Sequence, residues 1–391
     1  MPKATLKPRH EQRIARGHLW VYQGNIASID GDPAPGGEID VYSSRGDFLG
    51  RGYYNPRSQI AVRLLSREAG PIDKEFFAER IRQAQEYRAR FVPQASSYRL
   101  IYSEGDWLPG LIADRYEDVL VVQLLTLGMD RRRDEIVRAM AETVRPRAIY
   151  ERSDAQSRRH EGLEPRRGLL WGELPPQPMI IGENGLRFEI DVTEGQKTGY
   201  FLDQRENRRR LAPLVPGARV LDAFCHTGSF AIHALRYGAQ EVLGVDSSEQ
   251  AVAMARRNAA LNGFAGRARF VAANAFDFLR ELDRQGERFD CVILDPPAFA
   301  KGKAHVEAAR RGYKEVNLRG IKLLRSGGFL VTCSCSHHMT AAMFFELILD
   351  AAADARRQLR LVETGSQAKD HPVLAGVPET AYLKCFVFQV F

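Results

Sequence analysis

Residues 219–230, RVLDAFCHTGSF, join an apolar run of strand length to a helical run through a short loop that contains Gly228. Four further apolar runs follow, and helical runs separate them. This alternation is typical of a doubly wound parallel sheet that is buried on both faces. The chain from 187 to 391 is therefore predicted to form one α/β domain of this kind. Its predicted strands are residues 219–224, 241–246, 268–274, 289–295 and 327–334.

The loops after the first two predicted strands are candidate ligand sites, because ligands of such sheets bind beyond the carboxyl ends of the strands. The first loop does not contain GxGxxG, which excludes the dinucleotide fingerprint. Gly228 still allows a ligand to approach the backbone in front of a helix. Asp246 ends the second strand, where a carboxylate can accept both hydroxyls of a ribose. In the alternative interpretation, Asp246, Ser247 and Ser248 only cap the next helix.

The fourth and fifth predicted strands also end in side chains that can do chemistry. Asp295 is followed by two prolines, which form a stiff turn and hold the carboxylate at the sheet edge. The fifth strand runs into Cys333 and Cys335, which strand alternation places on the same side. Most lone cysteines are small buried hydrophobic residues. We single out Cys335 because it lies where the strand opens onto the predicted binding edge.

Composition sets the broad class of the protein. The chain has 391 residues, 44% of them hydrophobic and 27% charged, which favours two or three soluble globular domains and excludes a disordered or collagen-like chain. The five cysteines argue against a secreted disulfide framework, and His337 and His338 lack the spacing of a metal-ligand set. No signal peptide or membrane-spanning run is evident, so we expect a cytoplasmic protein without metal or membrane.

Two smaller regions precede the α/β domain. Residues 1–68 alternate apolar and polar residues between turns and are slightly basic, which predicts a small β-rich module. Residues 71–180 combine helical runs at 71–91 and 130–144 with strand-like runs, which predicts a small α+β domain. Residues 161–182 are rich in glycine and proline and are interpreted as the connection into the last domain.

The strand-ending motifs resemble those of class I S-adenosylmethionine (SAM)-dependent methyltransferases. DAFCHTGSF resembles their methionine-binding loop, GVDSS their ribose motif, and AANAFDFL their adenine motif. GQKTGYFLDQRENRR (195–209), LDPPAFAKGK and CSCSHHM together resemble bacterial large-subunit (23S) rRNA cytosine-C5 methyltransferases of the RlmI type. Members of that family carry an N-terminal PUA RNA-binding domain and a small middle domain. The resemblance covers the whole chain, including KPRHEQRIARGHLWVYQGNI and EGDWLPGLIADRY.

This resemblance implies a cofactor, a partner and a set of site residues. The cofactor is SAM, and its implied binding residues are Gln204, Arg205, Asp222, Phe224, Gly228, Asp246, Ser247, Asn274, Ala275 and Asp295. Lys197 and Tyr200 belong to the same motif as Gln204 and are further candidates. Cys335 matches the nucleophile of the family's Ser-Cys-Ser motif, and Asp295 would lie between cofactor and base. Cys333, two residues earlier, departs from the family pattern, so thiol chemistry alone does not assign the nucleophile.

The implied reaction forms 5-methylcytosine in large-subunit rRNA through a cysteine adduct at C6 of the base. Three arginine clusters, residues 131–133, 158–159 and 208–210, are candidate phosphate contacts or solvated faces. One alternative is an amino methyltransferase acting on N6 of adenine or N2 of guanine, although Ala298 stands where that class favours an aromatic residue. Another is a non-catalytic RNA-binding assembly factor. The residues do not fix the oligomeric state, and a dimer remains open.

Overall fold

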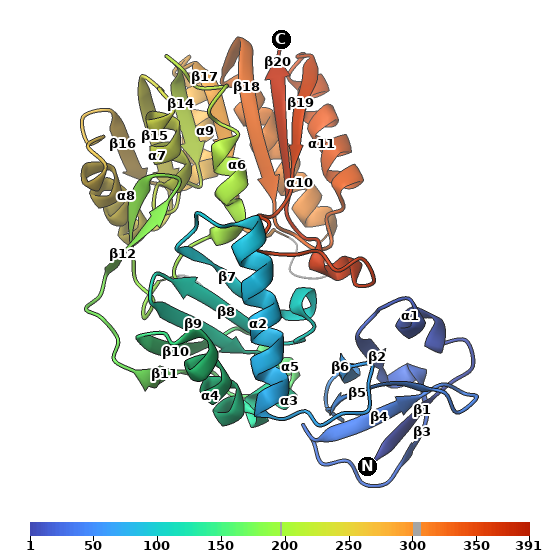
Figure 1. Cartoon of the computed structure of the whole chain (residues 1–391). Coiled ribbons are helices and arrows are strands. Elements are labelled where there is room, and N and C mark those ends of the chain that lie inside the picture. Colours follow the sequence, from blue (N-terminus) through green and yellow to red (C-terminus); the bar gives the residue numbers. More distant parts are fainter. Residues whose placement is uncertain (196–197, 300–305) are drawn as a thin grey trace. The chain divides into compact units, whose positions relative to one another are not determined.

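The structure, a computed structural model, describes residues 1–195, 198–299 and 306–391 (Figure 1). These residues form two compact units. Unit 1 comprises Met1–Ile181, Ile190–Leu202 and Lys369–Thr380, and unit 2 comprises Gly182–Glu189, Asp203–Ala368 and Ala381–Phe391. A two-stranded sheet of β12 (Met179–Glu183) and β13 (Leu186–Ile190) lies where the chain first passes between them. Unit 1 therefore contains three separate stretches of sequence.

Unit 2 is built on a seven-stranded sheet. Its strands are β14 (Arg219–Ala223), β15 (Glu241–Asp246), β16 (Ala268–Ala272), β17 (Phe289–Leu294), β18 (Leu324–Ser334), β19 (Leu359–Gly365) and β20 (Lys384–Val390). Their spatial order is β16-β15-β14-β17-β18-β20-β19. The first five are parallel, and β20 pairs antiparallel with both β18 and β19. The predicted doubly wound fold is confirmed, and the chain order reverses between β14 and β17, where ligands of such sheets bind.

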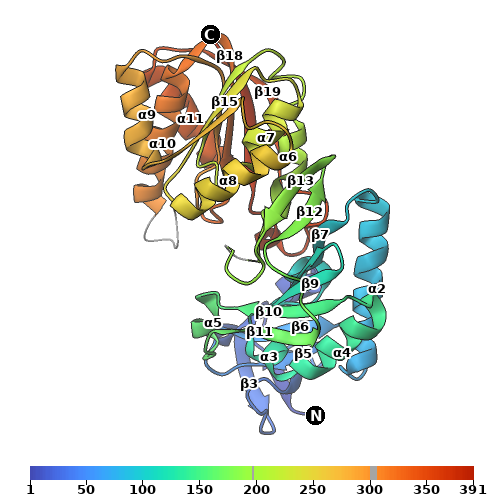
Figure 2. The same ribbon diagram turned by 90° about the vertical axis from the view of Figure 1, so that its left-hand side faces the viewer.

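Helices cover both faces of this sheet, as Figure 2 shows. They are α6 (Arg205–Arg209), α7 (Ser229–Arg236), α8 (Glu249–Leu261), α9 (Ala275–Arg284), α10 (Val306–Lys322) and α11 (Ala341–Asp354). Leu279, Val316 and Leu347, from α9, α10 and α11, pack with the sheet residues Val292 and Leu330 in one buried cluster. Because helices cover both faces of the sheet, its first five strands are apolar runs in the sequence.

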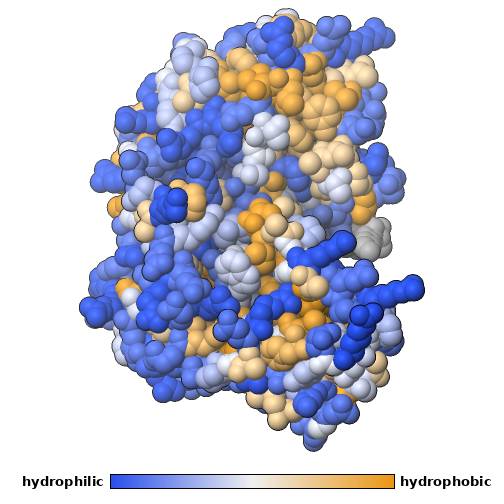
Figure 3. Space-filling view, turned by 45° about the vertical axis from the view of Figure 1, so that its right-hand side comes forward, coloured by the Kyte–Doolittle hydropathy of each residue, from blue (hydrophilic) through white to orange (hydrophobic). Residues whose placement is uncertain are grey.

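The edge of the sheet at β19 is exposed and partly apolar. Leu361 and Val362 on β19 are 45% and 48% exposed, and Leu349 on α11 is 46% exposed. Figure 3 shows apolar side chains gathered on the upper part of this face. A bulge between Leu361 and Glu363 interrupts the pairing with β20. Such a bulge makes an edge strand a poor template for further strand pairing.

The N-terminal part of unit 1 is a six-stranded sheet with one short helix, α1 (Glu11–Ala15). Its strands are β1 (Lys3–Leu6), β2 (Trp20–Tyr22), β3 (Ile26–Asp30), β4 (Glu38–Tyr42), β5 (Phe48–Tyr54) and β6 (Ile60–Ser66). Their spatial order is β2-β6-β5-β4-β1-β3. Residues such as Val41, Val62 and Leu64 form its apolar core. The β-rich character expected for residues 1–68 is therefore present.

The middle part of unit 1 is a five-stranded sheet with helices packed on it. Its strands are β7 (Ser97–Tyr102), β8 (Leu111–Tyr116), β9 (Val119–Leu124), β10 (Ala148–Ser153) and β11 (Arg166–Gly172), in the order β11-β10-β9-β8-β7. Its helices are α2 (Lys74–Phe91), α3 (Leu127–Arg131), α4 (Arg133–Val144) and α5 (Ser157–His160). The single helix expected at 130–144 is thus divided between α3 and α4.

The segment at 161–182, expected to be only a connection, contributes β11 to this sheet. β11 pairs antiparallel with β10, and Ala148 lies opposite Gly172. A side chain at Gly172 would meet the carbonyl oxygen of Arg147 at 1.9 Å, and its φ is +71°. Glycine is therefore required here by a close backbone approach within the sheet. From the sequence, the glycines of this segment indicated only a connecting loop.

The N-terminal part of unit 1 packs against the core of the middle part. Tyr53 of β5 is 1% exposed and packs among the apolar residues of the middle part. Its hydroxyl donates to the carbonyl oxygen of Pro109 at 2.7 Å. Arg63 of β6 pairs with Glu161 at 2.8 Å, with both side chains buried. The expected boundary between residues 68 and 71 therefore lies inside one compact unit.

The segment Lys369–Thr380 also belongs to unit 1. The backbone carbonyl of Asp370 accepts a hydrogen bond from the buried guanidinium of Arg88 at 2.8 Å, and its carboxylate accepts one from the backbone N–H of Arg99 at 2.8 Å. Glu379 pairs with Arg13 of α1 at 2.5 Å. The chain thus returns to unit 1 shortly before its end, and then enters β20 of unit 2.

Internal contacts occupy part of each arginine cluster, whereas Arg131, Arg159 and Arg209 are exposed and stay candidate phosphate contacts. Arg158 is 1% exposed, and Arg208 is 2% exposed and bonded to Glu183 at 2.7 Å. Arg133 pairs with Asp130 and Glu151. Sequence alone does not separate such buried ion pairs from a basic surface. No helix among the described residues is both long and apolar enough to cross a membrane.

Candidate active site

The ends of four parallel strands bring the predicted site residues of unit 2 to one edge of the sheet. Ala223 at the end of β14 lies opposite Leu294 at the end of β17, and Leu294 lies opposite Thr332 of β18. On the other side, Ala223 lies opposite Val245, one residue before the end of β15. The loops that leave these strands therefore start at the same level. Asp246 is the last residue of β15, and Asp295 and Cys335 follow β17 and β18 directly.

Asp222 is a buried carboxylate on β14. Its Oδ2 accepts a hydrogen bond from the backbone N–H of Ala231 in the first turn of α7 at 2.9 Å, whereas its buried Oδ1 has no hydrogen-bond partner within the described residues. Burial raises the pKa of Asp222 well above its usual range, and the nearby carboxylates of Asp295 and Asp246 raise it further. A carboxylate in this position is stabilised by a positively charged ligand.

The loop between β14 and α7 has an unusual backbone. Phe224, His226 and Gly228 have φ values of +66°, +49° and +82°, in the left-handed region. Non-glycine residues adopt such angles at a cost, and in general they cluster at ligand sites. A side chain at Gly228 would meet Phe270 and Ala255 at 3.1 Å. The conformation of this loop is therefore specific to the residues that form it.

Asp246 holds this loop in place from the end of β15. Its Oδ2 accepts from the backbone N–H of His226 at 2.9 Å, and its Oδ1 accepts from that of Ser248 at 3.0 Å. The N-cap of α8 is Ser248, whose hydroxyl accepts from the N–H of Ala251 at 3.2 Å. Because a carboxylate oxygen can accept more than one hydrogen bond, Asp246 still has acceptor capacity for a ligand. Ser247 is exposed beside it.

Asn274 and Ala275 follow β16. The Asn274 side chain caps α9 by accepting from the N–H of Phe276 at 3.0 Å, and Ala275 is buried. The rings of Phe224, Phe276 and Phe299 lie with their centroids 5.8–6.5 Å apart. These aromatic rings form an apolar group between the loops after β14, β16 and β17. Such a group suits the flat face of a base.

Gln204 connects the motif before α6 to the end of β17. Its Nε2 donates to Oδ1 of Asp295 at 2.9 Å, and its Oε1 accepts from Nδ2 of Asn207 at 2.6 Å. Gln204 is 3% exposed, whereas Asp295 is partly exposed. The adjacent Arg205 is 6% exposed and lies 3.9 Å from Glu183. Lys197, from the same motif, lies outside the described residues.

Burial separates the two candidate nucleophiles. Cys333 is fully buried on β18, opposite Cys385, and its hydrogen bond with the Cys385 thiol together with its burial raises its pKa well above the usual range. Such a thiol stays protonated and inert at neutral pH. Cys335 is partly exposed, while Cys225 and Cys291 are buried. β18 ends at Ser334, which is the predicted end of the fifth strand, and Cys335 follows it directly.

Two residues near Cys335, Lys384 and Tyr313, were not predicted from the sequence. The Lys384 ammonium donates to the carbonyl oxygens of Ser336 and Tyr382, each at 2.7 Å. The Tyr313 hydroxyl lies 2.9 Å from the Ser336 hydroxyl. Lys384 begins the largely apolar strand β20, and a lysine at the start of such a strand is the feature by which the sequence could have indicated it. Nothing in the sequence indicated Tyr313, because its position near Ser336 depends on how α10 packs on the sheet.

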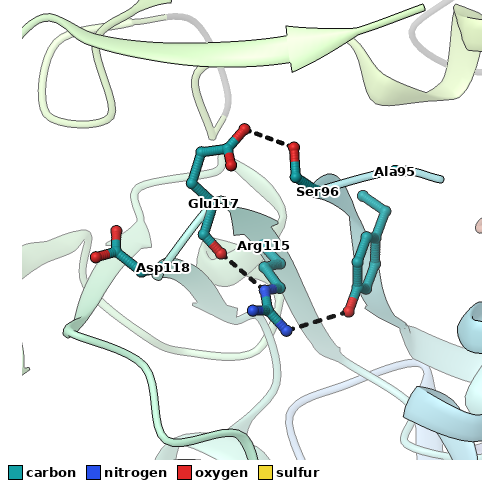
Figure 4. Close-up of a pocket in the computed structure, with 6 residues that line it drawn as sticks. Ala95, Ser96, Arg115, Glu117 and Asp118 are labelled. Carbon is teal, nitrogen blue, oxygen red and sulfur yellow. Dashed lines mark hydrogen bonds between the residues drawn. The ribbon is translucent and has the colours of Figure 1, made fainter. Parts of the chain in front are cut away.

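The structure also contains pockets outside this site. One, of about 560 Å³, lies in the middle part of unit 1 and is lined by Ala95, Ser96, Tyr98, Arg115, Glu117 and Asp118 (Figure 4). Arg115 donates to the backbone carbonyl of Glu117 at 2.8 Å, and Ser96 to its carboxylate at 2.6 Å. Arg115 also donates to the Tyr98 hydroxyl at 3.4 Å, so several of the polar groups that line this pocket bond to one another. Among the described residues, no cluster of three or more His, Cys, Asp or Glu side chains could hold a metal ion.

Two family profiles match the chain. One, described as a PUA-like domain, matches residues 4–67. The other, described as an S-adenosylmethionine-dependent methyltransferase, matches residues 99–389.

Among curated proteins, the chain is 44% identical to ribosomal RNA large subunit methyltransferase I of Shewanella denitrificans, over 100% of the chain and 99% of that protein. It is 42% identical to the protein of the same name from Vibrio cholerae, with the same coverage. Among solved structures, a methyltransferase in complex with SAH has a TM-score of 0.88 at 23% identity, with full coverage of both chains. A SAM-dependent methyltransferase from Streptococcus mutans has a TM-score of 0.86 at 22% identity, again with full coverage. These two likenesses concern the fold.

Proposed function

The chain belongs to the SAM-dependent methyltransferase family that includes ribosomal RNA large subunit methyltransferase I, and we propose that it methylates C5 of a cytosine in large-subunit ribosomal RNA. Its cofactor is SAM. The observation that carries the cytosine chemistry is the position of Cys335. It is a partly exposed thiol at the ligand-binding edge of the sheet, whereas the other four cysteines are buried.

The residues at the strand ends fit the cofactor. SAM carries a sulfonium and an ammonium, and the buried Asp222, with one carboxylate oxygen unpartnered within the described residues, suits a positive ligand. We assign the ribose to Asp246 and Ser247, the methionine part to Gly228 with Phe224, and the adenine side to Asn274 and Ala275. Gln204 and Arg205 then lie beside the cofactor. When bound, SAM supplies an electrophilic methyl group.

Cysteine addition is required because C5 of cytosine is a weak nucleophile. The Cys335 thiolate adds to C6, which breaks the aromaticity of the ring and makes C5 enamine-like. C5 then forms a bond to the methyl carbon, and the methyl–sulfur bond breaks to leave SAH. Loss of the C5 proton and of the cysteine restores the ring as 5-methylcytosine. Asp295, held by Gln204, would hydrogen-bond the edge of the cytosine and stabilise the polarised ring.

The base must leave its stack to meet both the thiol and the methyl group, so an unpaired or flipped cytosine is the expected substrate form. Positioning of the RNA is assigned to the N-terminal PUA-like part. Of the basic residues near α1, Arg9 and Arg16 are exposed, whereas Arg13 pairs with Glu379. Phosphate contacts from exposed arginines give affinity that falls with salt.

The deciding experiment uses the full-length protein, methyl-labelled SAM and large-subunit rRNA, followed by digestion to nucleosides. We expect label in 5-methylcytosine. Label in N6-methyladenine or N2-methylguanine would instead show an amino methyltransferase, and no label would leave a non-catalytic RNA-binding protein. RNA with 5-fluorocytosine at the target should trap a covalent complex with wild type but not with Cys335→Ala, because fluorine blocks the final elimination. No shifted band in a denaturing gel would contradict the covalent mechanism.

A further inference from the structure

Lys384 joins two segments that meet beside Cys335. It is the first residue of β20 and lies opposite Ser334, the last residue of β18. Its Nζ donates to the backbone carbonyl of Ser336 at 2.7 Å and to that of Tyr382 at 2.7 Å. The ammonium thus bonds to the residue that follows Cys335. These two carbonyl acceptors fix the position of the ammonium, whereas the ammonium of an exposed surface lysine is free to move.

The charge of Lys384 and that of Cys335 interact. Burial lowers the pKa of Lys384 to about 8, and the Cys335 thiolate acts in the opposite direction and raises it. An interaction free energy between two groups is reciprocal. If the thiolate favours the ammonium, the ammonium favours the thiolate by the same amount.

We propose that Lys384 is a positioning residue that stabilises the thiolate form of Cys335 and orients the loop that carries it. This inference rests on the proposed function, in which Cys335 is the nucleophile. An ordinary cysteine is only a few per cent ionised at pH 7, so a fixed cation beside it raises the reactive fraction. The lysine need not touch the RNA base to do this.

Three other titratable groups around this pair, Tyr382, Tyr313 and Cys333, are held by hydrogen bonds or burial, whereas His337 is exposed. The Tyr382 hydroxyl donates to Asp203 at 2.5 Å, and the ring of His337 lies 5.5 Å from that of Tyr382. Burial raises the pKa of Tyr313, whose hydroxyl contacts Ser336, so it is neutral at pH 7. Cys333 is likewise a neutral thiol. Of Lys384, Tyr382, Tyr313 and Cys333, only the lysine side chain can carry positive charge.

The test measures the alkylation rate of Cys335 by iodoacetamide against pH, in the full-length protein without RNA or SAM. The four buried cysteines should react slowly, and Cys335→Ser supplies the blank. We expect Lys384→Met to lower the rate at pH 7 about tenfold and to move the profile to higher pH, as loss of a neighbouring opposite charge does. Lys384→Arg should restore most of the rate. Lys314→Met, which removes an exposed ammonium paired with Asp354, should leave it unchanged.

Thermal melting shows whether Lys384→Met is folded, and Lys384→Gln provides a second variant if it is not. An alkylation profile that is the same in wild type and in the folded Lys384 variants overturns the inference, whatever the rRNA assay shows. A shifted profile in a protein that forms no 5-methylcytosine overturns the cytosine chemistry instead, and supports the coupling between Lys384 and Cys335. A shift that Lys384→Arg does not reverse would also contradict the role of charge.

Discussion

The side-chain amide of Gln204 donates to Oδ1 of Asp295 at 2.9 Å, and this hydrogen bond joins two motifs that are 91 residues apart in sequence. Gln204 is buried and is itself oriented by Asn207. Asp295 therefore has one carboxylate oxygen fixed by the protein, and it reaches the ligand-binding edge of the sheet in a defined orientation.

Replacing Gln204 should affect methylation through Asp295. In Gln204→Glu, two carboxylates share the site, and repulsion raises the pKa of the pair. We expect the rate at pH 7 to fall about tenfold, and the pH–rate profile to change shape on its acidic side. Gln204→Met, which removes the hydrogen bond without adding charge, should lower the rate at all pH values. Identical pH profiles for the two variants would contradict this role.

Cys335→Ala should abolish methyl transfer, by at least about 1000-fold, because the nucleophile is lost. SAM binding should stay within a few fold, since the thiol acts on the RNA base. Cys333→Ala is the matched control. It should keep most of the activity and lose about 1 kcal/mol of stability through the small cavity that it leaves. Equilibrium binding of SAM and rRNA methylation measure the two effects, and the reverse pattern would assign the nucleophile to Cys333.

Asp246→Ala should weaken SAM by about 1.5–3 kcal/mol, the range expected for hydrogen bonds to a charged group. The variant also frees the backbone N–H of His226, so the loop after β14 should lose order. Ser248→Ala is the control, because it removes only the cap of α8 and should lower stability by about 1 kcal/mol without changing the affinity for SAM. Calorimetry that finds the same SAM affinity in Asp246→Ala and wild type would restrict Asp246 to a structural role.

Charge reversal at Arg9 and Arg16 should weaken RNA binding in a salt-dependent manner. If each arginine contacts one phosphate, the double variant should reduce the slope of log K against log salt by about 2. The charge-retaining double lysine variant should bind nearly as well as wild type. Point variants are preferable to deleting residues 1–68, because that deletion would remove Tyr53 from the core of the middle part. Equal salt slopes in all three proteins would exclude this surface from RNA binding.

Acidification should destabilise the protein in part through His233. This residue is fully buried, and burial lowers its pKa to about 4. Its folded-state pKa is below the unfolded value near 6.5, so the unfolded state binds the proton first and stability is lost as the pH falls from 6.5 toward 4. The contribution between pH 7 and pH 5 is about 2 kcal/mol. Urea unfolding should show a smaller loss over this range in His233→Gln than in wild type.

Sequence reasoning was most accurate where local pattern and tertiary structure agree. The five parallel strands of unit 2 are apolar along their whole length because helices cover both faces, so their positions were readable within a few residues. β11 was missed because Gly172 serves a close approach to the start of β10, which no local pattern reveals. β19 and β20 were not assigned for a related reason. They extend an otherwise parallel sheet in the antiparallel sense, outside the alternation of strands and helices.

The site was predictable in its residues but not in their contacts. The motifs pointed to Asp246 and Asp295, but the hydrogen bonds of these two residues to His226 and Gln204 depend on how the loops fold. The choice between Cys333 and Cys335 needed burial, which two cysteines of one strand end do not show in sequence. Lys384 was missed because its partners, Ser336 and Tyr382, are brought to it by the pairing of β18 with β20.

The return of Lys369–Thr380 to unit 1 has a consequence for biosynthesis. Asp370, which accepts hydrogen bonds from Arg88 and Arg99, is synthesised 282 and 271 residues after these two arginines. A nascent chain emerges from its N-terminus, and domains generally fold in that order. Unit 1 cannot complete its core in this way, because one of its segments appears only after almost all of unit 2 has been made. The part of unit 1 that precedes Lys369 must therefore wait, partly assembled, until translation is nearly finished.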